Sequence, residues 1–84
     1  MSAFELLLRD ALASLLETEP ASIGFSKPFD ELGVDSLIAL RLVRQVVELT
    51  GIDIDIECIL DYPSIEQLAR HLTACRGVDG IEPV

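Results

Sequence analysis

The sequence is poor in basic side chains. Only six of its 84 residues are Lys or Arg, against 15 Asp or Glu, and the formal net charge is −9. Nucleic-acid binding needs Lys and Arg to displace counterions from phosphates, and electrostatic attachment to a membrane needs a polybasic segment. We therefore expect no nucleic acid and no membrane among the partners, and the acidity favours basic proteins.

Large aromatic side chains are also scarce. Tryptophan is absent, and the chain holds three Phe and one Tyr, although half of its residues are hydrophobic. Because the apolar content is mostly Leu, Ile and Val, it favours a compact helical core over a large aromatic pocket, and it excludes a disordered chain. A chain of 84 residues forms one small domain and cannot hold a cofactor-binding domain plus a substrate domain.

Cysteine and histidine are represented by Cys58, Cys75 and His71 alone. Two cysteines are too few for a secreted disulfide framework, which favours free thiols in a reducing compartment. His71 and Cys75 can share a helix face, and Cys58 could complete a zinc site, but the spacing matches no known ligand pattern. We expect no metal, two free thiols and a solvated His71 far from other reactive groups.

Long apolar runs and targeting signals are missing as well. No apolar run approaches the ~20 residues of a membrane span. The N-terminus has no basic region followed by an apolar stretch, the pattern of a signal peptide. We therefore expect a cytoplasmic location.

Helical periodicity is clearest at the start of the chain. The apolar residues that recur at helical spacing are Phe4, Leu7, Leu8, Ala11, Leu12, Leu15 and Leu16. They predict an amphipathic helix with Ser2 as its N-cap. Residues 18–34 predict a long loop because two prolines and two glycines interrupt the periodicity. We expect Phe29 and Leu32 to pin this loop to the core.

A second helix is predicted from Asp35 or Ser36 to about residue 50, with Asp35 as its N-cap. Its apolar arc spans roughly 200°, which is wider than the stripe of a one-sided surface helix. Two interpretations follow. Either the helix is central and nearly buried, or Leu37 and Leu40 stay exposed near its start and contact a partner.

Isoleucine alternates with acidic residues over residues 52–57, a pattern typical of a strand. A lone strand would leave its backbone hydrogen bonds without partners. We therefore predict an extended connector that turns into a short helix over residues 57–60.

Ser64 and Gln67 form a capping-box pattern ahead of a last helix that we expect to end near Cys75. The fold class is therefore all-α, a small four-helix bundle with three main helices, a short third helix and a long first loop. We expect residues 1–76 to form the domain and residues 77–84 to be a flexible tail or linker remnant.

Ser36 follows Gly33, Val34 and Asp35 at the junction of the long loop and the second helix. It can be a first-turn residue beside an N-cap, without chemistry. It can be a hydrolase nucleophile, but 84 residues do not supply the positioned histidine and oxyanion donors. It can also be modified by another enzyme, and a helix N-terminus favours a phosphate-bearing modification.

Four segments in order resemble acyl and peptidyl carrier proteins, which are small four-helix domains that carry substrates on phosphopantetheine. They are residues 29–37 (FDELGVDSL), 40–43 (LRLV), 50–52 (TGI) and 60–65 (LDYPSI), the last followed by Leu68 and Ala69. The resemblance spans about residues 4–73.

The resemblance implies that a phosphopantetheinyl transferase joins 4′-phosphopantetheine from coenzyme A to Ser36, and that Asp35 caps the helix beside this site. The arm's thiol would hold acyl or aminoacyl groups as thioesters. The chain would be a carrier and not an enzyme. Its partners would be a loading enzyme and an acceptor such as a ketosynthase, condensation or acyltransferase enzyme. The implied partner-binding residues are Leu37, Leu40, Arg41, Arg44 and Ile59.

The subfamily stays open between two kinds of secondary metabolism. Arg41 and Arg44 interrupt the acidic second helix of fatty-acid carriers. Residues 40–43 resemble peptidyl carriers, whereas Val34 and residues 61–64 resemble polyketide carriers. We predict a monomeric carrier of polyketide or nonribosomal peptide biosynthesis. The alternative is a noncovalent helical adaptor that retains the carrier fold.

Overall fold

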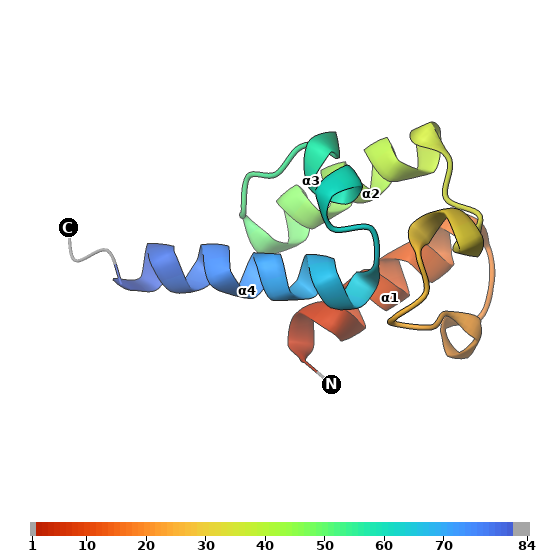
Figure 1. Ribbon diagram of the computed structural model, residues 1–84, viewed down its shortest axis with the longest axis horizontal. Coiled ribbons are helices and arrows are strands. Elements are labelled where there is room, and N and C mark those ends of the chain that lie inside the picture. The colour runs from red at the N-terminus through yellow and green to blue at the C-terminus, as the bar shows by residue number, and fades with distance from the viewer. Residues whose placement is uncertain (1, 82–84) are drawn as a thin grey trace.

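The computed structural model describes the backbone of residues 2–81 and the side chains of residues 2–75. The helices are α1 (Ala3–Leu16), α2 (Ser36–Thr50), α3 (Ile56–Asp61) and α4 (Ile65–Ile81) (Figure 1). Two 3₁₀ turns, Pro20–Ser22 and Phe29–Leu32, lie in the loop between α1 and α2. Within this described part, the one β-type pairing is an isolated bridge between Pro28 and Ser64. The predicted all-α four-helix class is confirmed.

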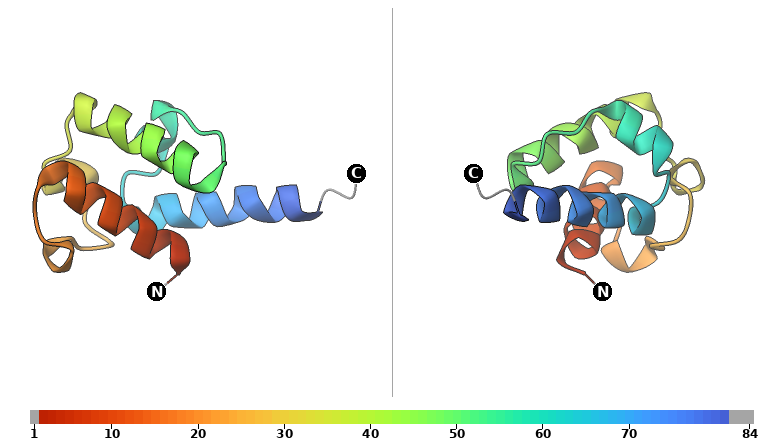
Figure 2. Two further views of the ribbon diagram at one scale, coloured as in Figure 1. Left: turned by 180° about the vertical axis from the view of Figure 1, so that it is seen from behind. Right: turned by 60° about the vertical axis from the view of Figure 1, so that its left-hand side comes forward.

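The three long helices enclose the core, and the short α3 lies beside α2 (Figures 1 and 2). α1 packs against both α2 and α4, while the last turns of α4 extend beyond the other helices. The largest fully buried side chains are Leu8, Leu12, Leu42, Val46, Ile65, Leu68 and Leu72. Each contributes about 1.5–3 kcal/mol through removal of its apolar surface from water. Within residues 2–81, no helix is both long enough and apolar enough to cross a membrane.

The N-terminus of α1 is closed by a capping box, as the sequence predicts for Ser2. The backbone N–H of Glu5 donates to Ser2 Oγ at 3.1 Å, and the N–H of Ser2 donates to Glu5 Oε1 at 2.8 Å. Both bonds satisfy donors that a helix start leaves free.

The long loop is tied to the core and to the start of α4. Phe29 is 4% exposed, and Leu32 packs against the core. The N–H of Phe29 donates to the carbonyl of Pro63 at 2.7 Å, and the N–H of Glu66 donates to the carbonyl of Phe25 at 2.9 Å. The expectation that Phe29 and Leu32 pin the loop is confirmed, and these bonds hold its second half in one place.

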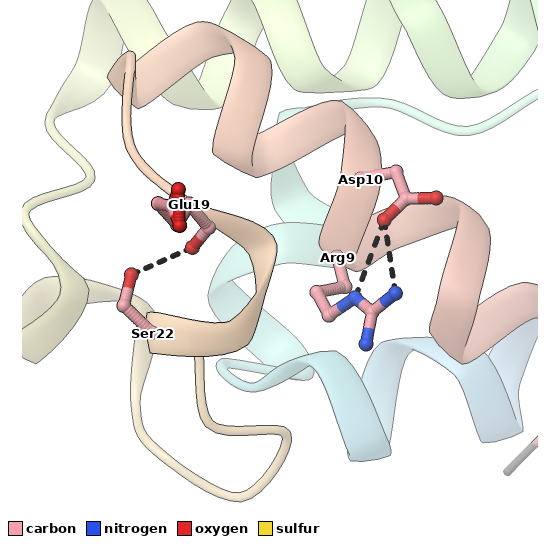
Figure 3. A network of polar contacts seen from close by, with 4 residues as sticks. All are labelled: Arg9, Asp10, Glu19 and Ser22. Carbon is pink, nitrogen blue, oxygen red and sulfur yellow. Dashed lines mark hydrogen bonds and ion pairs between the residues drawn. The ribbon is translucent and has the colours of Figure 1, made fainter.

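Short-range polar contacts order the first half of the same loop (Figure 3). Ser22 Oγ donates to the carbonyl of Glu19 at 2.7 Å. On α1, Arg9 donates from Nε and Nη2 to Asp10 Oδ1, both at 3.2 Å. The Arg9 guanidinium also lies 5.9 Å from the centroid of the Phe25 ring, within cation–π range. The Arg9 side chain therefore links α1 to the loop through its contacts with Asp10 and Phe25.

The connector before α3 is extended, as predicted. Ile52 and Ile54 are buried, whereas Asp53 between them is exposed. Asp55 caps α3 by accepting the N–H of Glu57 at 3.1 Å. The alternating pattern therefore places two isoleucines in the core without a second strand.

The last helix is longer than the sequence indicates. At its start, the N–H of Gln67 donates to Ser64 Oγ at 3.2 Å, which confirms Ser64 as the cap. The expected end near Cys75 is wrong, because α4 continues to Ile81. A glycine inside a helix costs only about 1 kcal/mol relative to alanine, so two glycines need not end it. The division into a domain and a tail stays a prediction, and residues 82–84 lie outside the described residues.

Candidate functional site

Ser36 is the first residue of α2, and its side chain is exposed. The carboxylate of Asp35 accepts the N–H of Ile38 at 2.9 Å, and the carbonyl of Asp35 accepts the N–H of Ala39 at 2.9 Å. Asp35 is therefore the N-cap that the sequence predicts. Because the cap holds the first turn of α2, the Ser36 side chain lies at an accessible position where the loop meets the helix.

The turn before Asp35 depends on the backbone of Gly33. Gly33 has φ +93°, a left-handed conformation that favours glycine. The N–H of Val34 then donates to the carbonyl of Phe29 at 3.0 Å, which closes the turn. Nothing lies within 4 Å of a Cβ built on Gly33, so the backbone angle alone requires glycine. This turn places the buried Phe29 and the exposed Ser36 along the same groove.

A groove of about 660 Å³ opens beside Ser36. The loop, α2 and α3 all contribute to its walls. Its apolar lining includes Val34, Ala39, Ile56, Ile59 and Leu60, and its acidic lining includes Asp30, Glu31 and Asp35. The serine hydroxyl therefore lies where a flexible apolar attachment has both solvent and a sheltered surface within reach.

One face of α2 stays exposed, which overturns the interpretation of a nearly buried helix. Leu37 is 56% exposed and Leu40 is 48% exposed. Arg41 and Arg44 are exposed beside them. Among the side chains that the structure describes, the one ion pair is between Arg9 and Asp10, so neither α2 arginine forms one there. We call Leu37, Leu40, Arg41 and Arg44 the exposed face of α2.

Ile59 does not lie on the outer surface, although the sequence analysis assigned it to partner binding. It is 4% exposed and belongs to the core, where it forms part of the groove wall. The next residue, Leu60, is 71% exposed and lines the same groove. Ile56, Ile59 and Leu60 all line the groove, but only Leu60 among them is largely exposed to solvent. Leu60 was missed because its exposure is set by how the short α3 packs on its neighbours, which no local pattern in the sequence gives.

His71 has close neighbours, contrary to the expected solvated and isolated position. Its Nε2 lies 3.5 Å from Cys75 Sγ and 3.8 Å from Cys58 Sγ. Its ring stacks on Tyr62 with centroids 4.3 Å apart. Both cysteines are free, as predicted. Within the described residues, no group of three or more His, Cys, Asp or Glu side chains is arranged to hold a metal ion.

Residues 7–72 match a protein-family model described as a phosphopantetheine attachment site. The chain belongs to this family and is a carrier domain of the acyl and peptidyl carrier type. Domains of this family carry 4′-phosphopantetheine. The resemblance noted on the sequence segments is confirmed, since the matched range contains the loop, α2 and α3 around Ser36.

Curated relatives are much longer than this chain. A non-reducing polyketide synthase of Didymella fabae is 33% identical over 70 residues, which cover 83% of this chain and 3% of the relative. An erythronolide synthase of Saccharopolyspora erythraea is 36% identical over 69 residues, which cover 81% of this chain and 2% of the relative. The chain thus corresponds to a small part of these proteins.

Solved carrier structures share the fold. A free-standing peptidyl carrier protein from an uncharacterized secondary metabolic pathway of Acinetobacter baumannii superposes with a TM-score of 0.81 at 28% identity, covering 84% of this chain and 89% of that one. A type-II acyl-carrier protein from Streptomyces verticillus, involved in bleomycin biosynthesis, gives a TM-score of 0.78 at 25% identity, covering 86% and 84%.

Proposed function

We propose that this chain holds biosynthetic intermediates on a 4′-phosphopantetheine arm attached to Ser36 Oγ and delivers them to partner enzymes. The observation that carries the proposal is the exposed Ser36 hydroxyl on the first turn of α2, inside the matched family region. When bound, the arm supplies a terminal thiol that forms thioesters with acyl or aminoacyl groups. The chain supplies the attachment point and the surface that partners recognise.

The residues at the site fit a phosphodiester. The N-terminus of a helix favours negative charge because its first N–H groups are unpaired and the helix dipole points its positive end there. Asp35 uses the N–H of Ile38 and holds the first turn in place. The hydroxyl of Ser36 is exposed, so a transferase can reach it.

Partner recognition is proposed for the exposed face of α2 together with Leu60. Apolar side chains that remain exposed near a polar rim are typical of protein interfaces. Leu37 and Leu40 lie within four residues of Ser36, and Leu60 lines the groove beside it. A partner that approaches Ser36 therefore meets these leucines first, with Arg41 and Arg44 selecting acidic groups on its surface.

The partner enzymes proposed here belong to polyketide or nonribosomal peptide biosynthesis. Both curated relatives described above are polyketide-type synthases, while one of the solved neighbours is a peptidyl carrier. We propose a transferase, a loading enzyme and an acceptor such as a ketosynthase, condensation or acyltransferase enzyme. The carrier domain itself catalyses no reaction in this proposal.

The test is intact-mass measurement after incubation with coenzyme A, magnesium and a broad-specificity phosphopantetheinyl transferase. The wild-type chain is expected to gain one phosphopantetheinyl group, and Ser36→Ala is expected to gain none. Ser26→Ala is the matched control, because Ser26 is another exposed serine in the long loop. A gain that survives Ser36→Ala would refute the assignment.

Intact-mass measurement also tests the alternative that the chain is a purely noncovalent adaptor. A chain purified from cells that contain a competent transferase is expected to carry the arm. Fully unmodified protein from such cells, with partner binding equal in Ser36→Ala and wild type, would favour the adaptor instead.

A further inference from the structure

Two cysteines from different helices meet one histidine nitrogen. Cys58 belongs to α3, whereas His71 and Cys75 belong to α4. Both sulfurs lie within sulfur hydrogen-bond distance of the same atom, His71 Nε2, at 3.8 Å and 3.5 Å. All three side chains are partly buried, and none of them lines the groove beside Ser36.

The histidine ring is held in a defined orientation. Tyr62, at the end of α3, stacks on it with an interplanar angle of 15°. One imidazole nitrogen makes one hydrogen bond at a time, either as an acceptor through its lone pair or as a donor through its N–H. The two sulfurs therefore share a single partner, and Nε2 is placed to accept a proton from either thiol.

A thiol beside a base is the arrangement that activates cysteine as a nucleophile. We propose that Cys58, His71 and Cys75 form a thiol pair that reacts with small-molecule disulfides and closes into an intramolecular Cys58–Cys75 disulfide. This site is separate from Ser36, and the inference does not depend on the proposed carrier function.

The chemistry balances with a disulfide such as oxidised glutathione as oxidant. Cys75, the nearer thiol, gives its proton to His71 Nε2 while its sulfur attacks one sulfur of the disulfide. The disulfide bond breaks, and the departing glutathione thiolate takes the proton. Cys58 then attacks the Cys75 sulfur of the mixed disulfide, gives its proton through Nε2, and releases a second glutathione thiol. The protein loses two hydrogens, and one oxidised glutathione becomes two reduced molecules.

Closure brings the two sulfurs, which contact the same nitrogen, to about 2.05 Å from each other. α3 has six residues and is joined on both sides by irregular segments, so it can move without unfolding a long helix. It also supplies Ile56, Ile59 and Leu60 to the groove wall. The bridge would therefore tie the groove wall beside Ser36 to α4.

The experiment uses the full chain with Ser36→Ala, in which Cys58 and Cys75 are the two thiols. The chain is incubated with oxidised glutathione, quenched with an alkylating reagent, and analysed by intact mass and non-reducing peptide mapping. We expect an intramolecular disulfide with both cysteines protected. Cys58→Ser is expected to stop at a mixed disulfide with one glutathione.

The role of the histidine is tested with His71→Phe, which keeps a ring against Tyr62 and removes the nitrogen. Bridge formation is expected to slow by about tenfold or more, since general-base assistance is typically worth at least that factor. Circular dichroism checks that this variant folds. As a readout independent of the variant, the α3 amides of the oxidised chain are expected to exchange more slowly with deuterium than those of the reduced chain.

Three outcomes would overturn the proposal. One is oxidation that yields only disulfides between two chains. Another is a chain that carries two glutathiones and never forms the bridge. The third is folded His71→Phe that forms the bridge at the wild-type rate, because the histidine would then have no part in the reaction.

Discussion

Asp35 and Ser36 are sequence neighbours with different structural tasks. The carboxylate of Asp35 accepts the N–H of Ile38 at the end of the loop, while Ser36 has an exposed side chain on the first helical turn. Gly33 makes the arrangement possible through its left-handed backbone. Each of the three residues thus meets one local requirement of the site: Gly33 forms the turn, Asp35 caps the helix and Ser36 presents the hydroxyl.

Loss of the cap should destabilise the fold measurably. Asp35→Ala is expected to lower the free energy of unfolding by about 1 kcal/mol, because the N–H of Ile38 loses its acceptor. Asp35→Asn is the matched control and should retain most of the stability, since asparagine caps nearly as well. Urea denaturation followed by circular dichroism measures both. Equal losses in the two variants would show that charge, and not capping, is what matters.

The glycine before the site is testable against a second glycine of the same loop. Gly33→Ala should cost roughly 1–2 kcal/mol, since an L side chain is strained at positive φ. At Gly24 a Cβ would meet Lys27 Cγ at 3.4 Å, an ordinary contact with a flexible side chain, and no left-handed φ is required. Gly24→Ala should therefore leave the urea midpoint nearly unchanged or raise it. Similar losses at both glycines would contradict the backbone explanation.

At the scale of elements, α2 performs two tasks with two faces. Ala39, Leu42, Val43 and Val46 are buried against the rest of the bundle. The opposite face leaves Leu37 and Leu40 exposed. The helix therefore presents leucines to solvent next to Ser36 without weakening its own attachment to the core.

Substitutions at two leucines of α2 test stability and partner recognition separately. Leu42 is fully buried, so Leu42→Ala should cost roughly 2–5 kcal/mol in the free energy of unfolding. Leu37→Ala should change stability by less than about 0.5 kcal/mol, because its side chain is already exposed. The same Leu37→Ala variant should reduce the rate of phosphopantetheine transfer several-fold. A large fall in its melting temperature would show that Leu37 stabilises the core instead.

At the scale of the whole molecule, net charge and local charge differ in sign. The chain has a net charge of −9, yet α2 contains Arg41 and Arg44 against the single acid Glu48. Among the described side chains, the α2 arginines take part in no ion pair. The exposed face of α2 is therefore less acidic than the net charge of the chain indicates.

Charge reversal at one arginine should distinguish the effect of the local charge on α2 from the effect of the net charge. Arg41→Glu is expected to lower kcat/KM of the transferase reaction several-fold, with a weaker effect at high salt because exposed charges are screened. Arg70→Glu on α4 changes the net charge equally, and Arg70 is also exposed, so it is the matched control. It should leave kcat/KM close to wild type. Equal losses in both variants would attribute the effect to net charge.

Local sequence signals predicted most of the helical framework. The helical spacing of leucines in α1 and the caps Ser2 and Asp35 each act within a few residues of themselves, so they can be recognised along the chain. The end of α4 was misjudged, because a glycine is a weak stop that neighbouring residues can outweigh.

Side-chain environments were predicted less well. The exposure of Leu37 was left open between two interpretations, Ile59 was assigned to partner binding although its side chain is buried, and Leu60 was missed. His71 was expected to be isolated, but α3 brings Cys58 and Tyr62 to it. These errors share one cause, since burial depends on which face each helix turns toward its neighbours.

The amino-acid sequence by itself determined the helical class, the position of Ser36 beside its cap, and the family, because these depend on spacing and local backbone chemistry. Tertiary packing decided which leucines remain exposed, where the groove opens, and that Cys58, His71 and Cys75 meet. Contacts between residues distant in the chain depend on how the helices pack, and periodicity within one helix does not set the orientation of its neighbour.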